Sequence, residues 1–465
     1  MKHFLPILLL SLSTASCVST ETSKQEIIPK KNTVPKNIIM VIGDGMGPAY
    51  TSAYRYFSDN PNTEMVEKTV FDRHLIGLSS TYPAAISGVV TDSAASATAL
   101  ATGIKSYNGA IGVDVNKKSV QSVLEWAKLQ GKATGVIVTS QINHATPASY
   151  LTHNENRKNY NAIADSYIDD GIKADLYLGG GWQYFIREDR NIVDDFKQAG
   201  FHYLDNYQGL SKLPNNKPVL GLFANAGLPA ALDDTNKHRL SAMTKAGVHH
   251  LVDYQNNTTA ENQGFFLLVE ASQIDWAGHN NDISGAMAEM DDLAKTLEYL
   301  EHFVEHHPDT LVIVTADHST GGFTIGTKGK YLWQPDKLRS MKHSPTYIAK
   351  ELVKNKITPA IAATLFNFEL SNDDITLLIH SKNTAILNNI TKIKKLQSTS
   401  TLEFSLALTI KQIMNKYSYT GWTSGGHTAI DVPVFAFGKR SELFGGYQDN
   451  TDIAKKIFSL LGKKL

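Results

Sequence analysis

The segment NIIMVIGDGMGPAY, residues 37–50, joins an uninterrupted apolar run to a turn that holds an aspartate between two glycines. An apolar run without alternating polar residues is typical of a strand that is buried on both faces of a parallel sheet. In open α/β sheets, ligands bind outside the carboxyl ends of the strands, which is where Asp44 falls. The stretch therefore predicts both the class of fold and the edge of the sheet where function lies.

Further apolar runs of the same kind recur along the chain, and helical patterns separate many of them. One such pattern begins near Ile283 and repeats apolar residues at helical spacing, which predicts a long helix packed on the core. We therefore predict an α/β fold, a three-layer sandwich with a central, mainly parallel sheet flanked by helices. The other predicted strands are Thr134–Val138, Leu176–Leu178, Phe265–Val269, Leu311–Val314 and Val432–Phe437.

Residues 328–416 differ from the rest of the chain, because they contain amphipathic helical stretches and no strong strand signal. We predict a basic helical insertion there. It holds 14 Lys and Arg against 6 Asp and Glu, so the remaining 31 and 39 make the body acidic although the totals of 45 and 45 are equal. The lysines are scattered without interleaved stacking aromatics, so no nucleic-acid partner is expected. A solvated helical face is the simple alternative to a functional role.

The amino terminus predicts export. A basic start, an apolar run over 4–12 and small residues before Cys17 are typical of a signal peptide over 1–16, followed by a flexible linker over 17–36 and a catalytic domain over 37–465. The apolar run is shorter than the ~20 residues that a membrane span needs. Two interpretations of Cys17 remain: a lipid attachment site, because small residues before Cys resemble a bacterial lipoprotein signal, or a free thiol left by ordinary cleavage. Either places the protein in the periplasm or on the bacterial envelope.

Acids and imidazoles follow four of the predicted strands. Taken singly, an aspartate after a strand is usually a turn former or a helix cap. Taken together, they offer the mixed oxygen and nitrogen donors that suit zinc, and so many carboxylates would repel each other without a cation. The residues are Asp44, then His144 and Thr146, then Glu270, Asp275 and His279, and finally Asp317 and His318.

Two Gly-rich or small-residue stretches need separate interpretation. The turn after the first strand is not a dinucleotide-binding loop, because position 48, where the third glycine would fall, is Pro. The stretch TDSAASATA, residues 91–99, predicts a helix start. Asp92 or Ser93 either caps that helix, or Ser93 is a nucleophile at a helix N-terminus that receives an anion.

Six separated motifs together resemble those of the alkaline phosphatase family: GDGMG at 43–47, DSAAS at 92–96, HATP at 144–147, VEASQIDWAGH at 269–279, TADH at 315–318 and GHT at 426–428. The likeness runs from about Asn37 to the C-terminus and leaves out much of 328–416. It implies a homodimeric hydrolase of small phosphate monoesters with broad specificity. In this family the insertion often lies over the active-site entrance or at the dimer contact, which is the role we favour here.

The resemblance also implies a role for each site residue. Ser93 would attack phosphorus and become a phosphoserine, with Arg157 gripping the phosphate and Asp92 orienting it. One zinc ion would be held by Asp275, His279 and His427, and a second by Asp44, Asp317 and His318. A third ion, magnesium, would use the oxygen donors of Asp44, Thr146 and Glu270.

The sequence departs from the best-known bacterial pattern at two positions, with His144 in place of Asp and Trp276 in place of Lys. The first change leaves open whether His144 contacts the third metal or only an intervening water. The second removes a positive charge, which predicts faster release of phosphate. The alternatives are a phosphodiesterase or sulfatase of the same superfamily, or a non-catalytic exported protein that binds metal or phosphate. The sequence lacks the usual sulfatase motif, and none of the expected ligands is missing.

Overall fold

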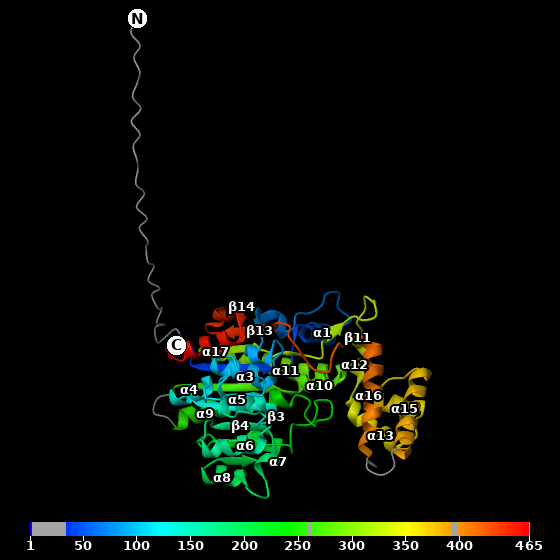
Figure 1. Cartoon of the computed structure of the whole chain (residues 1–465), viewed down its shortest axis with the longest axis horizontal. Helices are drawn as coiled ribbons and strands as arrows, with labels where there is room; N and C mark the ends of the chain where they lie inside the picture. Colours follow the sequence, from blue (N-terminus) through cyan, green and yellow to red (C-terminus); the bar gives the residue numbers. More distant parts are fainter. Residues whose placement is uncertain (2–33, 259–261, 392–398, 465) are drawn as a thin grey trace. The chain divides into compact units, whose positions relative to one another are not determined.

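The computed structural model describes the chain except residues 2–33, 259–261, 392–398 and 465 (Figure 1). The predicted signal peptide, Cys17 and most of the predicted linker lie outside the described residues. From Val34 onward the chain forms one compact unit. No helix among the described residues has the length and apolar character needed to cross a membrane.

Ten strands form one sheet in the order β14-β2-β13-β8-β1-β7-β3-β4-β6-β5. Only β13 runs antiparallel to its neighbours, so the sheet is mainly parallel, as predicted. The strands are β1 (Asn37–Gly43), β2 (Leu75–Ser80), β3 (Ala133–Gln141), β4 (Leu176–Gly180), β5 (His202–Leu204), β6 (Val219–Leu222), β7 (Phe265–Ala271), β8 (Thr310–Thr315), β13 (Val432–Gly438) and β14 (Gly446–Asp449).

Strand β1 is buried along its whole length and pairs with β7 on one side and β8 on the other. Ile42 is in register with both Glu270 and Thr315. Since the three strands are parallel, the residues that follow them emerge at one edge of the sheet. That register brings Asp44, Glu270 and Asp317 together.

Two hydrophobic layers, one on each face of the sheet, complete the sandwich. Alternate residues of β1 divide between them, because successive side chains of a strand point to opposite faces: Ile39 and Val41 belong to one core, Ile38 and Met40 to the other. The first core is covered by α1 (Pro48–Ser58), α2 (Val70–His74), α9 (Arg239–Thr258), α10 (Gln273–His279) and α11 (Ile283–His306). The second is covered by α3 (Ser93–Thr102), α4 (Val123–Leu129), α5 (Ala145–Leu151), α6 (Tyr160–Asp169), α7 (Trp182–Phe185), α8 (Ile192–Gln198) and α17 (Asn450–Leu460).

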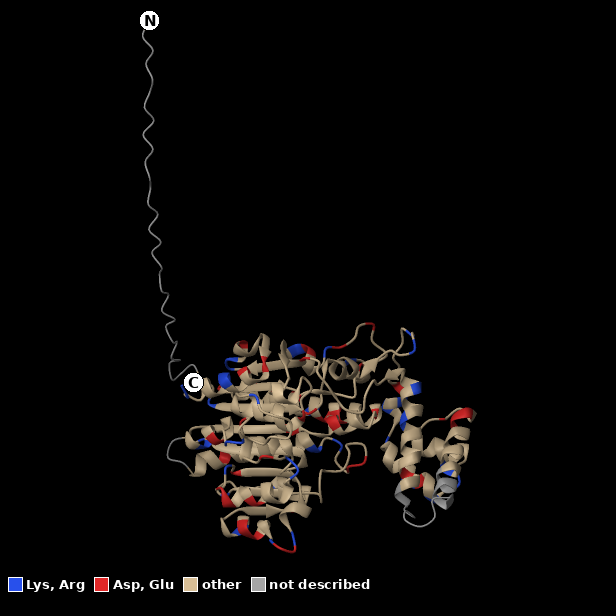
Figure 2. Ribbon diagram, in the orientation of Figure 1, with Lys and Arg blue, Asp and Glu red and all other residues tan. Residues whose placement is uncertain are grey.

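Five helices lie between Asp336 and Ser418, and Figure 1 shows α12, α13, α15 and α16 gathered in one cluster. Ser344 and Thr358 cap two of them, each followed by a proline that suits the first helical turn. Acidic and basic residues are interspersed over this cluster and the body (Figure 2). The helices are α12 (Asp336–Ser340), α13 (Pro345–Lys354), α14 (Pro359–Phe366), α15 (Asn372–Thr391) and α16 (Thr399–Ser418).

Short elements connect these layers. Two small two-stranded sheets are of direct importance to the site, because each pairs the segment after β8 with the segment after α16. They are β9 (Ser319–Thr320) with β12 (His427–Thr428), and β10 (Thr324–Ile325) with β11 (Thr420–Gly421). The 3-10 turns are Ala85–Ser87, Tyr207–Lys212 and Ser441–Phe444.

Candidate active site

Helix α3 begins at Ser93, whose side chain is buried at the edge of the sheet where β1 and β8 end. Asp92 caps the helix by accepting a hydrogen bond of 2.9 Å from the backbone N–H of Ala95, and it accepts another of 3.0 Å from Gly109. The small residues of α3 are all buried, which allows the helix to pack closely against α5 and α17. The capping interpretation is therefore confirmed for Asp92, and the Ser93 hydroxyl at the helix N-terminus takes no part in the cap.

Arg157 approaches the same helix terminus from the loop that follows α5. Its Nη1 lies 3.0 Å from the Oδ2 of Asp92, and its Nη2 lies 3.4 Å from the Nε2 of His144. Its backbone N–H donates to Gly109, the residue whose own N–H donates to Asp92. The guanidinium is thus held by a carboxylate beside Ser93, an arrangement that could receive an anion.

The Nε2 atom of His318 is a point on which several oxygens converge. It lies 3.1 Å from the hydroxyl of Ser93 and 3.1 Å from the Oδ2 of Asp317. The Oδ1 of Asp44 is 3.4 Å away. Gly45 makes this crowding possible: its φ is +76°, and its N–H donates to Asp317. A Cβ on Gly45 would lie 2.7 Å from the backbone of Asp275, so only glycine fits.

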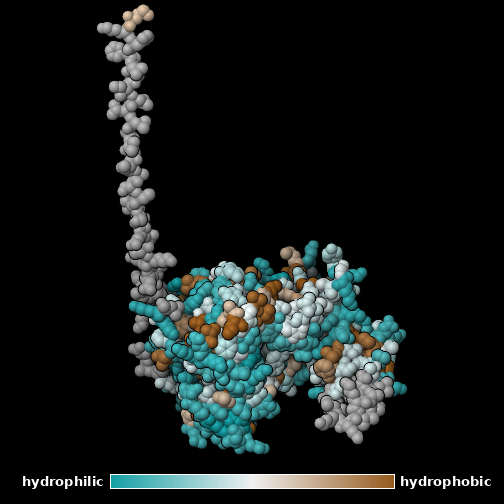
Figure 3. All heavy atoms as spheres, viewed as in Figure 1, coloured by the Kyte–Doolittle hydropathy of each residue, from teal (hydrophilic) through white to brown (hydrophobic). Residues whose placement is uncertain are grey.

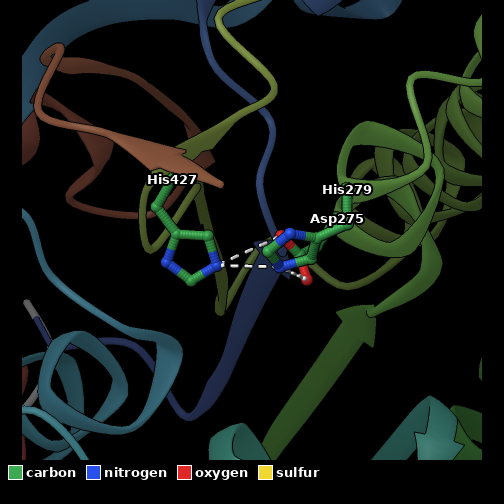
Figure 4. Close-up of side chains that lie close together, drawn as sticks. All are labelled: Asp275, His279 and His427. Carbon is green, nitrogen blue, oxygen red and sulfur yellow. Dashed lines mark hydrogen bonds and ion pairs between the residues drawn. The ribbon is translucent and has the colours of Figure 1, made fainter. Parts of the chain in front are cut away.

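A second group joins Asp275 and His279, one turn apart on α10, to His427 on β12 (Figure 4). The Nε2 atoms of the two histidines lie 3.1 Å from each other. The Oδ2 of Asp275 is 3.3 Å from His279, and its Oδ1 is 3.5 Å from His427. In Figure 4 both rings point their Nε2 atoms toward the carboxylate.

Backbone carbonyls fix the tautomers of these two rings. The Nδ1 of His279 lies 2.7 Å from the carbonyl of Gly425, and the Nδ1 of His427 lies 2.9 Å from the carbonyl of Thr91. Each Nδ1 therefore carries a proton, and the two Nε2 atoms face each other with lone pairs unless a cation or proton lies between them. In the protein alone, the hydrogen bond to Asp275 raises the pKa of His279 to about 9, whereas burial and the charge of His318 lower the pKa of His427 to about 4.

The spacing of both groups fits a tetrahedral zinc ion. Zinc bonds of ~2.0–2.1 Å imply ligand atoms about 3.3 Å apart. The three distances among Asp275, His279 and His427 are 3.1, 3.3 and 3.5 Å. Those from His318 to Asp317 and Asp44 are 3.1 and 3.4 Å. In both groups these separations are close to the spacing that such an ion requires.

A third group consists of Asp44, His144 and Glu270, with Thr146 beside them at the start of α5. Several of its buried polar atoms have no hydrogen-bond partner: both oxygens of Asp44, the Oε1 of Glu270, the Nδ1 of His144 and the Oγ1 of Thr146. Burial raises the pKa of Glu270 to about 7. Burial and then the charges of Asp317 and Asp275 raise the pKa of Asp44 well above its usual value. Orphaned, mutually repelling oxygens are what a hard cation would satisfy.

Trp276 forms a wall beside the third group. Its ring meets that of His144 edge-on, with centroids 6.0 Å apart and planes at 80°. Gly227 lies against the other side of the indole, where a Cβ would be 2.3 Å from Cη2. The indole therefore occupies a slot that depends on the absence of a side chain at position 227.

Thr320 was not predicted from the sequence, although its side chain contacts both Asp275 and His318. Its hydroxyl donates to the Oδ1 of Asp275 at 2.5 Å and lies 3.2 Å from the Nδ1 of His318. Its place two residues after His318, in the same polar segment that follows β8, was the available signal. All of the predicted site residues lie in this one region of the molecule.

Comparison with known proteins gives a consistent result. A family model described as alkaline phosphatase matches residues 35–463. Alkaline phosphatase 3 of Bacillus subtilis (strain 168) is 43% identical over 469 residues, which span 99% of this chain and 97% of the relative. The crystal structure of a cold-active alkaline phosphatase from the psychrophile Shewanella sp. is 47% identical with a TM-score of 0.82, over 92% of this chain and 100% of that one. A histidine-to-glutamate variant of TAB5 alkaline phosphatase, described with magnesium bound in its M3 site, is 28% identical with a TM-score of 0.66, over 93% and 99%.

Proposed function

This chain belongs to the alkaline phosphatase family and is a metal-dependent hydrolase of phosphate monoesters, and we propose that Ser93 carries the phosphoryl group as a phosphoserine intermediate. The observation that carries the proposal is the buried Ser93 hydroxyl, 3.1 Å from His318 and next to the Arg157–Asp92 pair. A nucleophile and an anion clamp at a helix N-terminus are what phosphoryl transfer needs.

The residues divide the reaction between them. Arg157 binds two non-bridging oxygens of the substrate, and Asp92 keeps the guanidinium aimed at Ser93. The Ser93 hydroxyl gives up its proton to water and its oxygen forms a bond to phosphorus, while the bond to the alcohol oxygen breaks and the departing alkoxide takes up one proton from water. In the second half a water oxygen attacks the phosphoserine, the bond from phosphorus to Ser93 breaks, and the serine hydroxyl and inorganic phosphate are restored.

Three metal sites complete the proposal. Asp275, His279 and His427 would hold one zinc ion, Asp44, Asp317 and His318 another, and Asp44, Thr146 and Glu270 a magnesium ion beside His144. When bound, these ions would lower the pKa of the Ser93 hydroxyl and of the attacking water and would neutralise charge that develops on the phosphoryl oxygens. The fit of the ligand spacing to zinc and the orphaned oxygens around Asp44 support this assignment.

The test compares 4-nitrophenyl phosphate with bis(4-nitrophenyl) phosphate before chelation, after chelation, after addition of zinc, and after addition of zinc and magnesium. We expect turnover of the monoester to be lost on chelation and restored in two stages, and turnover of the diester to stay far lower. A preference for the diester would support a phosphodiesterase instead. Metal or phosphate binding without turnover by the zinc-loaded protein would support the non-catalytic alternative.

We propose that the protein is a homodimer that associates through an apolar face near Ser93. Ile86 and Val89 are 79% and 69% exposed in the loop that leads to α3, and Tyr447 on β14 is 70% exposed beside Leu78 on β2. Figure 3 shows brown apolar residues gathered over the region of α3 and β13. Light scattering on an Ile86→Lys, Val89→Lys double variant should give the mass of a monomer, whereas Met65→Lys, at an exposed position in another loop, should leave a dimer. A monomeric unsubstituted protein would contradict this proposal.

Export, the division into signal peptide, linker and catalytic domain, and lipidation at Cys17 are further proposals that rest on the sequence. The mass of the mature protein from a membrane fraction, compared with that of Cys17→Ser, tests them. A diacylglycerol adduct that disappears in Cys17→Ser supports the anchor, and a soluble mature form without an adduct supports ordinary cleavage.

A further inference from the structure

The turn after α10 links His279 to the start of α11 and is built from Asn280, Asn281 and Asp282. Asn281 has a φ of +50°, a left-handed conformation that few residues other than glycine adopt. Asn280 returns its side chain to the carbonyl of Trp276 at 2.8 Å. The His279 ring is therefore followed directly by a tight turn with a left-handed residue at its centre.

Helix α16 holds this turn with two residues one helical turn apart. The Nζ of Lys411, which is 8% exposed, donates to the Oδ1 of Asn280 at 3.3 Å. The Nδ2 of Asn415 donates to the backbone carbonyl of Asn281 at 3.1 Å. The contact joins a helix of the 328–416 segment to the residues directly after a proposed metal ligand.

The other end of the Asn415 amide reaches the segment that carries His427. Its Oδ1 accepts a hydrogen bond of 3.0 Å from the Nε1 of Trp422. Trp422 in turn stacks on Phe323, with ring centroids 4.9 Å apart. From Trp422 the chain continues through Gly425, whose carbonyl contacts the Nδ1 of His279, to His427 itself. One amide thus bridges the segment after His279 and the segment before His427.

A second asparagine strengthens the same bridge. With its side-chain nitrogen facing the neighbouring carbonyls, Asn281 donates to Gly278 at 3.0 Å and to Ser424 at 2.9 Å. Asn281 and Asn415 therefore both cross between the end of α10 and residues 422–427. Among the described residues, α16 makes no hydrogen bond to Asp44, Asp317 or His318, so its direct contacts lie on the side of the Asp275–His279–His427 group.

We propose that Asn415 is a positioning residue for the Asp275–His279–His427 group, and that through it the helical segment sets how tightly this group binds zinc. The inference rests on the proposed metal function. The two histidine rings must stay about 3 Å apart at their Nε2 atoms to share an ion, and a residue that fixes the two segments carrying them lowers the cost of assembling the site. If Asn415 merely attached the helices to the body, replacing it would change the zinc affinity of both proposed zinc groups or of neither.

The experiment measures zinc affinity of the full mature chain by competition with chelators, with reference variants His279→Ala and Asp317→Asn to identify each group. Outer partners of metal ligands are typically worth about 10–100-fold in affinity, so Asn415→Leu should weaken the His279-dependent step by that factor and leave the Asp317-dependent step unchanged. Asn415→Asp should weaken it too, because its carboxylate would face the Asn281 carbonyl. Trp422→Phe, which keeps the ring stack, should weaken the His279-dependent zinc affinity by less than Asn415→Leu does. The two substitutions combined should weaken it little more than Asn415→Leu alone. Gln412→Ala, exposed on the same helix, is the matched control.

The outcomes separate the two proposals. If the unsubstituted protein shows no zinc binding that His279→Ala removes, the proposed metal site itself is wrong. If the unsubstituted protein does bind zinc in a His279-dependent step, two results would overturn the role of Asn415. In one, Asn415→Leu binds zinc equally tightly; in the other, it weakens the His279-dependent and Asp317-dependent steps to the same degree. Thermal unfolding of the metal-free variants checks that each is folded, and Trp422→Phe supplies a milder change should Asn415→Leu fail to fold.

Discussion

The hydroxyl oxygen of Ser93 lies 3.1 Å from the Nε2 of His318, across 225 residues of sequence. If Ser93 is the nucleophile, Ser93→Ala should lower kcat for a phosphate monoester by on the order of 10³-fold or more, because the hydroxyl that forms the ester is removed. Acid-trapped phosphoenzyme should disappear, while the zinc content stays near that of the unsubstituted protein. A trapped phosphoenzyme in Ser93→Ala would show that another residue carries the phosphoryl group.

Gly227 controls the slot of Trp276. We expect Gly227→Ala to displace the indole, because the new Cβ would lie 2.3 Å from Cη2 and 2.5 Å from Cζ3. Since the ring packs against His144, the magnesium concentration needed for half-maximal activity should rise. Adding Trp276→Leu to Gly227→Ala should relieve the clash and recover much of the stability that Gly227→Ala loses, measured by thermal unfolding. An unchanged magnesium requirement in Gly227→Ala would show that the indole of Trp276 does not influence the group formed by Asp44, His144 and Glu270.

The absence of a lysine at position 276 predicts weak product inhibition. The double variant His144→Asp, Trp276→Lys adds a positive charge beside the phosphate, and a charge-assisted hydrogen bond is worth about 1.5–3 kcal/mol, so Ki for inorganic phosphate should fall roughly tenfold or more. Steady-state inhibition measures this, with each single substitution as a control. Unchanged inhibition by phosphate would refute the explanation.

Arg239 tests the contribution of buried charge to stability. It is fully buried, with its Nη2 2.9 Å from Glu289 and its Nη1 2.9 Å from Asp292. Arg239→Met would leave these carboxylates buried without a partner, so we expect a loss of about 3–5 kcal/mol in the free energy of unfolding. Arg73→Met, which breaks the half-exposed pair with Glu301, should cost less than about 1 kcal/mol. Equal losses in urea unfolding would contradict this prediction.

The pair of His153 and Glu125 predicts a pH dependence of stability. Burial lowers the pKa of His153, but the hydrogen bond and charge of Glu125 outweigh it, so the net pKa is raised above 6.5. A raised histidine pKa contributes stability that is full below about 6.5 and is lost as the pH rises through the folded pKa. Glu125→Gln, which can keep the capping box with Ser122, should therefore cost more at pH 6 than at pH 9. A cost that is the same at both pH values in urea unfolding would show that His153 is not charged in the folded protein.

The apolar runs predicted the buried strands well, because a strand covered on both faces needs apolar residues at every position. Each of the six predicted runs lies within a strand of the sheet, and the run from Ile283 lies in α11. Strands β2, β5, β6 and β14 were not predicted. In β2, Leu75 and Leu78 are exposed, Ile76 is partly buried, and the remaining residues are Gly and Ser, so neither of the usual strand patterns is visible.

The candidate site could be predicted where it depends on parallel strands, whose carboxyl ends meet at one edge. The contributions of Thr320, Gly227 and Asn415 could not, because they arise from the docking of loops and of α16 onto that edge. A single polar residue in a loop or on a helix gives no periodic signal.

Within the described part of the chain, strand β2, formed by residues 75–80, pairs only with β13 and β14, which begin at Val432 and Gly446. During synthesis, β2 therefore has no pairing partner until almost the whole chain has been made. His427 lies shortly before β13 in the same late part of the sequence. This edge of the sheet and the Asp275–His279–His427 group would therefore be completed together. We expect a nascent or truncated chain that ends before His427 to leave β2 unpaired and to lack the complete Asp275–His279–His427 group. Completion of the C-terminus is therefore the step that commits the protein to its folded, metal-binding form.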